Sequence, residues 1–188
     1  MKKLFAILLL LSGTAFADPS VSLNYGMTKN QSGTTAGTES DQVALRIASD
    51  VNTKGTTADL ILIQARNQSS NGLTNTYEFG LAQKFAINEN VIPYVRIATG
   101  AIMPSTRTSM TYIAIEPGVV LRSSSIPVFA KIDYTVGTGL NTSALDATMT
   151  RVALGYNITK NTSLVVRQDW VRGDMKQETT WLSLGYRF

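Results

Sequence analysis

Residues 178–188, ETTWLSLGYRF, decide the fold, because their polarity alternates from one position to the next. One parity is apolar and carries Leu182, Leu184, Tyr186 and Phe188. The other parity carries Thr179, Trp181, Ser183 and Arg187. Successive side chains of a β-strand point to opposite faces, so a period of two predicts a strand with one apolar and one polar face.

The amino-terminal residues have a different pattern, that of a secretory signal peptide. Lys2 and Lys3 precede an apolar run over residues 4–11, and small residues stand at Ala15 and Ala17. This order of a basic segment, an apolar segment and small residues is typical of a cleaved signal. The apolar run is well short of the roughly 20 residues that a membrane-spanning helix needs. We therefore predict a signal peptide over residues 1–17 and one domain over residues 18–188.

The period of two recurs along the rest of the chain, and convincing amphipathic-helix patterns do not. We count ten alternating segments of roughly ten residues each, with eight as the main alternative. Two segments are less regular than the others, and they lie at residues 57–66 and 91–101. Soluble strands are typically five or six residues long, whereas a tilted strand that crosses a membrane needs about ten. The pattern favours a closed antiparallel transmembrane β-barrel over a soluble β-sandwich or lipocalin-like barrel.

The connections and the aromatic residues indicate an orientation for this barrel. Longer stretches rich in Ser, Thr, Asn and Gly follow the odd segments, and shorter ones follow the even segments. Long outer loops and short periplasmic turns are typical of outer-membrane barrels, so both termini are expected in the periplasm. Aromatic residues of the apolar parity are expected in two girdles. The outer girdle would hold Tyr77, Tyr134 and Trp170, and the periplasmic girdle Phe85, Tyr156, Tyr186 and Phe188.

Pro117 interrupts one of the predicted strands. Proline cannot donate a backbone hydrogen bond, and a closed barrel has no free edge that would tolerate the missing donor. We therefore expect a β-bulge at Glu116-Pro117-Gly118.

The last strand, with Tyr186 and a final Phe188 on its apolar face, resembles the carboxy-terminal signature of bacterial outer-membrane β-barrels. The resemblance covers the mature chain as an architecture and implies a location in the outer membrane. It also implies that Tyr186 and Phe188 are recognised by the barrel-assembly machinery during insertion. Outer-membrane lipid and this machinery are therefore the expected partners.

If the apolar parity faces lipid, the other parity lines the lumen and carries thirteen charged residues. These residues are Arg46, Asp50, Glu78, Lys84, Arg96, Glu116, Arg122, Lys131, Asp133, Arg151, Arg167, Asp169 and Arg187. Eight are basic and five are acidic, a net charge of +3. Small residues on the same parity, such as Gly80, Gly118 and Gly155, leave gaps for long side chains. Barrels of about eight strands are filled by their own side chains, and those of 16 to 18 enclose an aqueous channel.

Two functions are consistent with this lumen. The charges can form an ion-pair network that largely fills the barrel of a structural or surface protein, since unpaired charges are costly in a confined space. Alternatively, the basic surplus can leave a narrow porin-like path with a weak preference for small anions, which would then be further partners. The first interpretation is the one that the sequence favours.

Other classes of function have less support in the sequence. The chain has no histidine and no cysteine, so we predict no enzymatic activity, no metal and no cofactor. Without Lys2 and Lys3 the chain carries 15 basic and 13 acidic residues, too small a surplus to indicate nucleic-acid binding. The tripeptide Arg172-Gly173-Asp174 leaves surface recognition as a further alternative.

Overall fold

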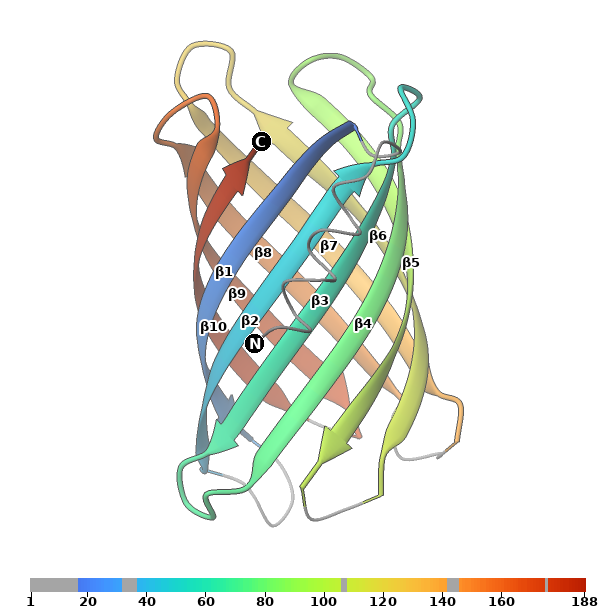
Figure 1. The fold of residues 1–188 in the computed structure, drawn as a ribbon, viewed down its shortest axis with the longest axis vertical. Coiled ribbons are helices and arrows are strands. Elements are labelled where there is room, and N and C mark those ends of the chain that lie inside the picture. Colours follow the sequence, from blue (N-terminus) through green and yellow to red (C-terminus); the bar gives the residue numbers. More distant parts are fainter. Residues whose placement is uncertain (1–16, 32–36, 106–107, 142–145, 175) are drawn as a thin grey trace.

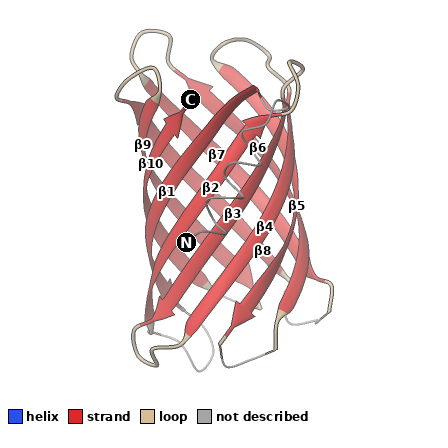
Figure 2. Cartoon of the chain, viewed as in Figure 1, coloured by secondary structure: helices blue, strands red, loops and turns tan. Residues whose placement is uncertain are grey.

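The computed structural model describes residues 17–31, 37–105, 108–141, 146–174 and 176–188, and strands form most of them (Figure 1, Figure 2). No helix in these ranges is long and apolar enough to cross a membrane. The strands are β1 (Ala17–Asn30), β2 (Glu39–Asp50), β3 (Thr56–Asn67), β4 (Leu73–Lys84), β5 (Val91–Pro104), β6 (Met110–Arg122), β7 (Val128–Gly139), β8 (Ala147–Asn157), β9 (Thr162–Gly173) and β10 (Gln177–Arg187).

The ten strands form a single closed barrel in which each strand is antiparallel to both of its neighbours (Figure 1). The barrel closes between the first and last strands, where Val21 pairs with Tyr186 and Leu23 with Leu184. Closure leaves no unpaired sheet edge. The predicted all-β barrel and its strand number of ten are both confirmed.

The outer surface of the barrel is apolar, the inverse of a soluble fold. In β10, Leu182 and Leu184 expose 52% and 54% of their surfaces, whereas the alternate residues Trp181 and Ser183 are buried. The same alternation recurs in the other strands, for example at Phe79 beside Gly80. An apolar outer face and a polar inner face are the arrangement of barrels that reside in lipid.

The strands are longer and the connections shorter than the sequence predicted. Strands run for 11 to 14 residues, and the ladder takes in many of the Thr and Gly residues expected in loops. The connections span three to eight residues at one end of the barrel and four to six at the other. The predicted contrast between long and short connections is therefore slight. Both ends of the described chain lie at one end of the barrel, since Ser20 pairs with Arg187.

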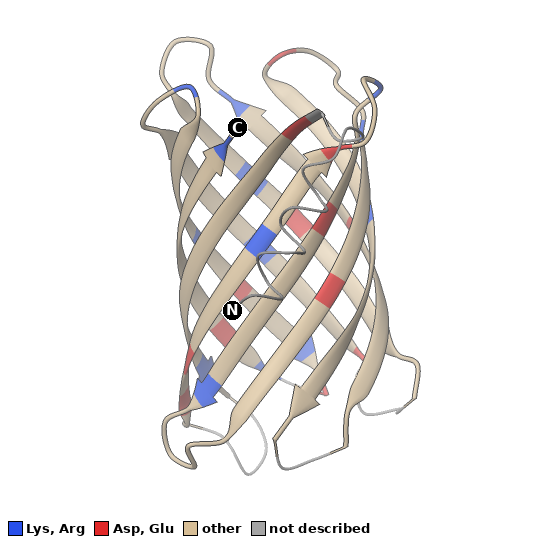
Figure 3. Ribbon diagram, in the orientation of Figure 1, with Lys and Arg blue, Asp and Glu red and all other residues tan. Residues whose placement is uncertain are grey.

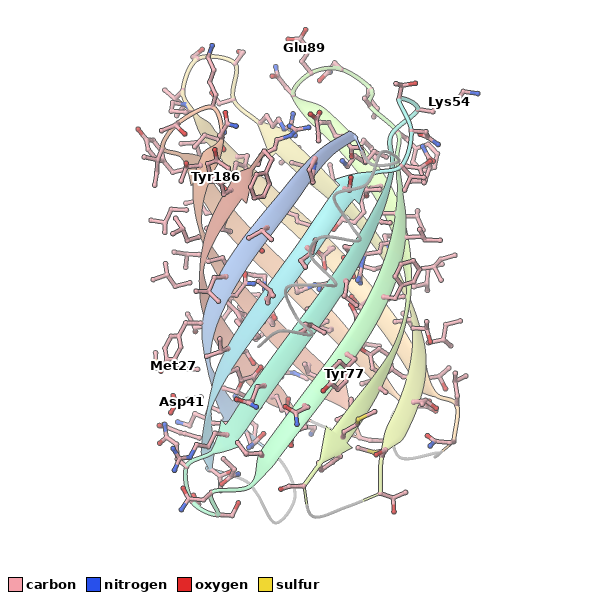
Figure 4. All side chains as sticks on the ribbon, viewed as in Figure 1. Met27, Asp41, Lys54, Tyr77, Glu89 and Tyr186 are labelled. Carbon is pink, nitrogen blue, oxygen red and sulfur yellow. The ribbon has the colours of Figure 1, made fainter. Side chains whose placement is uncertain are left out.

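The outward aromatic residues form girdles that lie partly within the strands. Tyr186 and Phe188 pack edge to face, with ring centroids 5.1 Å apart, at the end of the barrel that holds the carboxy terminus. Tyr77 points outward nearer the opposite end (Figure 4). Tyr134, expected at a strand end, lies near the middle of β7, because this strand continues past it to Gly139.

The predicted bulge at Pro117 is absent. Ile115 pairs with Val136 and Gly118 with Asp133, so the register between β6 and β7 is the same on both sides of the proline. Only the pairs of Glu116 and Pro117 are missing from the ladder between β6 and β7. The barrel accommodates the missing N–H by omitting local pairs and does not insert a residue.

The irregular segment at residues 57–66 forms β3, which has apolar residues on both faces. Leu60 pairs with the outward Ile47, whereas Ile61 pairs with the inward Arg46. Asp59 also points inward and is 4% exposed. The run of four aliphatic residues hid this parity, so Asp59 was not predicted as a lumen residue.

Candidate functional site

Charged residues lie on the strands around the middle of the barrel (Figure 3). Ion pairs join their inward side chains, and we call this group the belt. The belt draws on eight consecutive strands, β2 to β9. Its members are Arg46, Asp59, Glu78, Arg96, Glu116, Lys131, Asp133, Arg151, Arg167 and Asp169. Nine of them are among the thirteen residues predicted from sequence, and Asp59 is the addition.

Arg96 joins three carboxylates in one half of the belt. Its Nη2 lies 2.6 Å from Asp59 Oδ1 and 2.7 Å from Glu78 Oε1, and its Nη1 lies 3.2 Å from Glu116 Oε2. The side chain of Arg96 is only 5% exposed. Arg46 Nη2 donates to the other oxygen of Asp59 at 2.5 Å. A planar guanidinium suits this arrangement because its donors fan out in fixed directions.

The second half of the belt is centred on Arg151. This side chain forms ion pairs with Glu116 and Asp133. Lys131 Nζ lies 3.2 Å from Asp133 Oδ2 and 3.7 Å from Glu116 Oε1. The hydroxyl of Tyr94 donates to Asp133 Oδ2 at 2.9 Å. Because Glu116 also meets Arg96, the two halves form one continuous network from β2 to β8.

A smaller group completes the belt beside the closing strands. Arg167 Nε lies 2.8 Å from Asp169 Oδ1, and Trp181 Nε1 donates to Asp169 Oδ2 at 2.8 Å. The guanidinium of Arg167 sits 4.8 Å from the centre of the Trp181 ring, within the range of a cation–π interaction. Trp181 was placed on the lumen parity by the sequence, but its role as a partner of Asp169 was not predicted.

Glycines on the inner wall give the large inward side chains a place to lie. A Cβ added to Gly118 would come within 2.5 Å of Tyr94 Cζ, and one added to Gly26 would come within 2.6 Å of Trp181 Cε3. The complete set of pairs is Gly26–Trp181, Gly80–Arg96, Gly100–Tyr112, Gly118–Tyr94 and Gly155–Phe129. The predicted use of small residues as gaps for long side chains is confirmed, and these side chains lie flat against the wall.

The remaining four predicted residues lie at the rim of the barrel, at the end that holds the carboxy terminus. They are Asp50, Lys84, Arg122 and Arg187. Lys84 Nζ lies 3.3 Å from Asp50 Oδ1, and Arg187 Nη2 lies 2.8 Å from Asp18 Oδ2. The belt itself holds five cations and five anions, so the basic surplus predicted for the lumen is located at this rim.

The belt has equal numbers of cations and anions, but the two kinds of side chain differ in how far they are exposed to the lumen. The side chains of Asp59, Glu116 and Asp133 are 4% exposed or less. Those of three cations are far more accessible: Arg46 at 40%, Lys131 at 28% and Arg167 at 29%. Because these side chains point inward, the space they are exposed to is the lumen. Cations therefore form the inner surface, and most of the carboxylates lie behind them.

The belt follows the wall of the barrel. Its longest links join strands two apart, as between Arg96 on β5 and Asp59 on β3, or Arg151 on β8 and Glu116 on β6. Among the described residues, no belt contact joins opposite walls. The network therefore surrounds the axis without bridging it.

Solved structures with a similar fold include several outer-membrane proteins. An outer membrane channel from Pseudomonas putida F1 aligns with a TM-score of 0.59 at 9% identity, covering 94% of this chain and 98% of that one. The NanC porin aligns with a TM-score of 0.57 at 10% identity, covering 89% and 100% of the two chains. The KdgM porin in complex with disordered oligogalacturonate aligns with a TM-score of 0.50 at 12% identity, covering 90% of this chain and 99% of that one.

No protein-family model and no curated protein matches the chain. Identities this low carry information on the fold alone. The fold is that of the bacterial outer-membrane β-barrels, as the carboxy-terminal strand implied.

Proposed function

We propose that the protein is a narrow outer-membrane channel with a weak preference for small anions. The observation that carries this proposal is the accessibility of three belt cations, Arg46, Lys131 and Arg167, from inside the barrel. A lumen packed solid with side chains would bury them as deeply as Arg96. We therefore favour the second of the two functions that the sequence allowed.

Anion preference follows from the layering of the belt. An ion in the lumen meets the exposed cations at close range, and the carboxylates behind them at longer range. Rings of basic side chains favour anions in this way. The preference is expected to be weak because the five belt carboxylates cancel most of the field at a distance.

The location and the character of the neighbours agree with a channel. The similar structures include an outer membrane channel and porins, and one of these porins is in complex with disordered oligogalacturonate. The periplasmic position of both termini, cleavage after residue 17 and recognition of Tyr186 and Phe188 by the assembly machinery belong to the same proposal. A chain without histidine or cysteine also gives no support for an enzyme.

A structural barrel with a closed lumen is the second candidate. The observation that favours it is the equal number of cations and anions in the belt, and the near-complete burial of Arg96 among three carboxylates. In this case the belt would serve to hold the strands in register.

Conductance of the refolded protein in planar bilayers distinguishes the two candidates. The channel predicts reproducible unitary steps and a reversal potential displaced toward that of chloride in a salt gradient. Arg46→Gln should reduce this displacement, whereas Arg66→Gln, on the outer face, should not. Absence of steps from correctly folded protein would support the structural barrel.

A further inference from the structure

The belt cations differ in how many of their donors are used. Arg96 meets three carboxylates and Arg151 meets two. Arg46 and Arg167 each have a single carboxylate partner within the ranges that the structure describes. A guanidinium has five N–H donors, and within the described part of the chain Arg46 Nε and Arg167 Nε have no hydrogen-bond acceptor.

Lys131 is comparable to these two arginines, although it has two carboxylate partners. Both partners, Glu116 and Asp133, are also held by Arg151. Its ammonium carries three donors and is partly open to the lumen. Lys131 can therefore turn toward a ligand while the two carboxylates remain paired.

The strands that carry these three cations span half of the barrel's circumference. Arg46 is on β2 and Lys131 on β7, and five steps separate these strands in either direction around the ten-stranded barrel, so the two strands lie on opposite sides of it (Figure 1). Arg167 is on β9, between them on one side. In their twelve-residue strands, Arg46 is the eighth residue, Lys131 the fourth and Arg167 the sixth, so none of them lies at a strand end.

We propose that Arg46, Lys131 and Arg167 form one binding site for a small oxyanion, a carboxylate or a sulfate-like group, on the axis of the barrel. The site deepens the proposed function, on which it rests, because it names the class of anion that pauses in the channel. The belt has no net charge, so unused N–H donors and not a long-range field would provide the binding. Donors in fixed directions favour oxygen acceptors over spherical halides.

Nuclear magnetic resonance of the full mature chain in zwitterionic micelles tests the site directly. The probe is sodium sulfate, compared with sodium chloride at equal ionic strength. We expect the side-chain Nε–H resonances of Arg46 and Arg167 to shift and saturate together, with a dissociation constant on the order of 1 mM. Arg46→Gln should weaken sulfate binding at Arg167 by roughly tenfold.

Arg66 and Arg172, which are exposed outside the lumen, provide internal controls, and Arg66→Gln is the matched variant. The site is overturned if the Arg46 and Arg167 resonances move no more than these controls, if they fail to saturate, or if Arg46→Gln leaves the affinity at Arg167 unchanged. Saturable sulfate binding in a protein that does not conduct would support the site and contradict the channel. Conductance without saturable sulfate binding would support the channel and contradict the site.

Discussion

Arg96 meets three carboxylates with one buried guanidinium, and among the belt residues only Glu116 has as many ion-pair partners. The guanidinium of Arg96 packs directly over Gly80, against the inner wall of the barrel, and reaches partners on β3 and β6. Loss of one partner from a buried network is costly because it leaves the remaining charges without compensation.

Replacement of Arg96 by Gln should therefore destabilise the barrel by about 3–5 kcal/mol. Unfolding in guanidinium chloride, followed by tryptophan fluorescence in micelles, measures the change. Arg66→Gln removes an arginine from the outer face and should change the free energy of unfolding by less than about 0.5 kcal/mol. A loss at Arg96 no larger than that at Arg66 would contradict the role of Arg96 in the belt.

Glycines on the inner wall differ in whether a large side chain lies over them. Gly118 and Gly137 both face inward on neighbouring strands, but only Gly118 lies under a ring. A Cβ at Gly118 would meet Tyr94 and Asp133, whereas one at Gly137 would have nothing nearer than 3.6 Å.

We expect Gly118→Ala to destabilise the barrel by about 1–3 kcal/mol through this overpacking. Gly137→Ala should have little effect or a slight stabilising one. Chemical denaturation of both variants under the same conditions provides the comparison, and equal effects would show that a glycine under the ring is not needed.

Single residues also show how far the sequence could predict the site. Parity alone placed Arg96, Asp133 and Arg151 on the inner face, because a strand has only two faces. Their partners could not be predicted, since they come from strands up to two apart and depend on the tilt of the barrel. Asp59 was missed because its strand is apolar on both faces, with Ile61 inside and Leu60 outside.

The strands follow the sequence closely at the scale of elements, and the exceptions have local causes. Alternation predicted most of the strands, with residues 57–66 and 91–101 less regular, but it could not predict where strands end, because Thr and Gly occur both in loops and in the ladder. Pro117 shows a different limit: a missing donor can be met by a bulge or by a gap, and only the register of the neighbouring strands decides between them.

The gap at Pro117 can be tested by restoring the donor. Pro117→Val keeps an apolar residue on the outer face and supplies an N–H toward β7, where the register places Tyr134 opposite. We expect a gain of about 0.5–1 kcal/mol in the free energy of unfolding, partly offset by the greater freedom of the unfolded chain. Slower amide exchange at Tyr134 than in the unmodified protein, and a protected amide at the substituted position, should accompany this gain. Unchanged exchange at Tyr134 would show that the gap does not weaken the ladder.

The whole molecule is the scale at which the sequence was most informative about fold and least informative about function. Ten alternating segments and a polar inner parity predicted a closed barrel. Whether the lumen is open depends on how side chains such as Arg46 and Tyr94 lie against the wall, which parity does not determine.

The last residue provides a prediction at this scale. Phe188 N donates to Pro19 O at 2.9 Å, and its ring packs on Tyr186 at the outer surface. If Phe188 is a recognition signal, its deletion should reduce insertion by the assembly machinery several-fold while leaving the stability of protein refolded in micelles nearly unchanged. Phe85→Ala, another outward aromatic residue, is the control and should insert normally. Equal insertion with and without Phe188 would contradict the signal.

Pairing of β1 with β10 has a consequence for how the chain must mature. β1 and β10 are the first and last strands of the barrel, so the barrel cannot close until β10 has been synthesised and has reached β1. Until then the incomplete sheet has two unpaired edge strands and exposes its apolar outer face to water. Both features promote aggregation. Because pairing between strands this far apart in the sequence is intrinsically slow, unsealed chains need to be kept apart from one another until β10 meets β1.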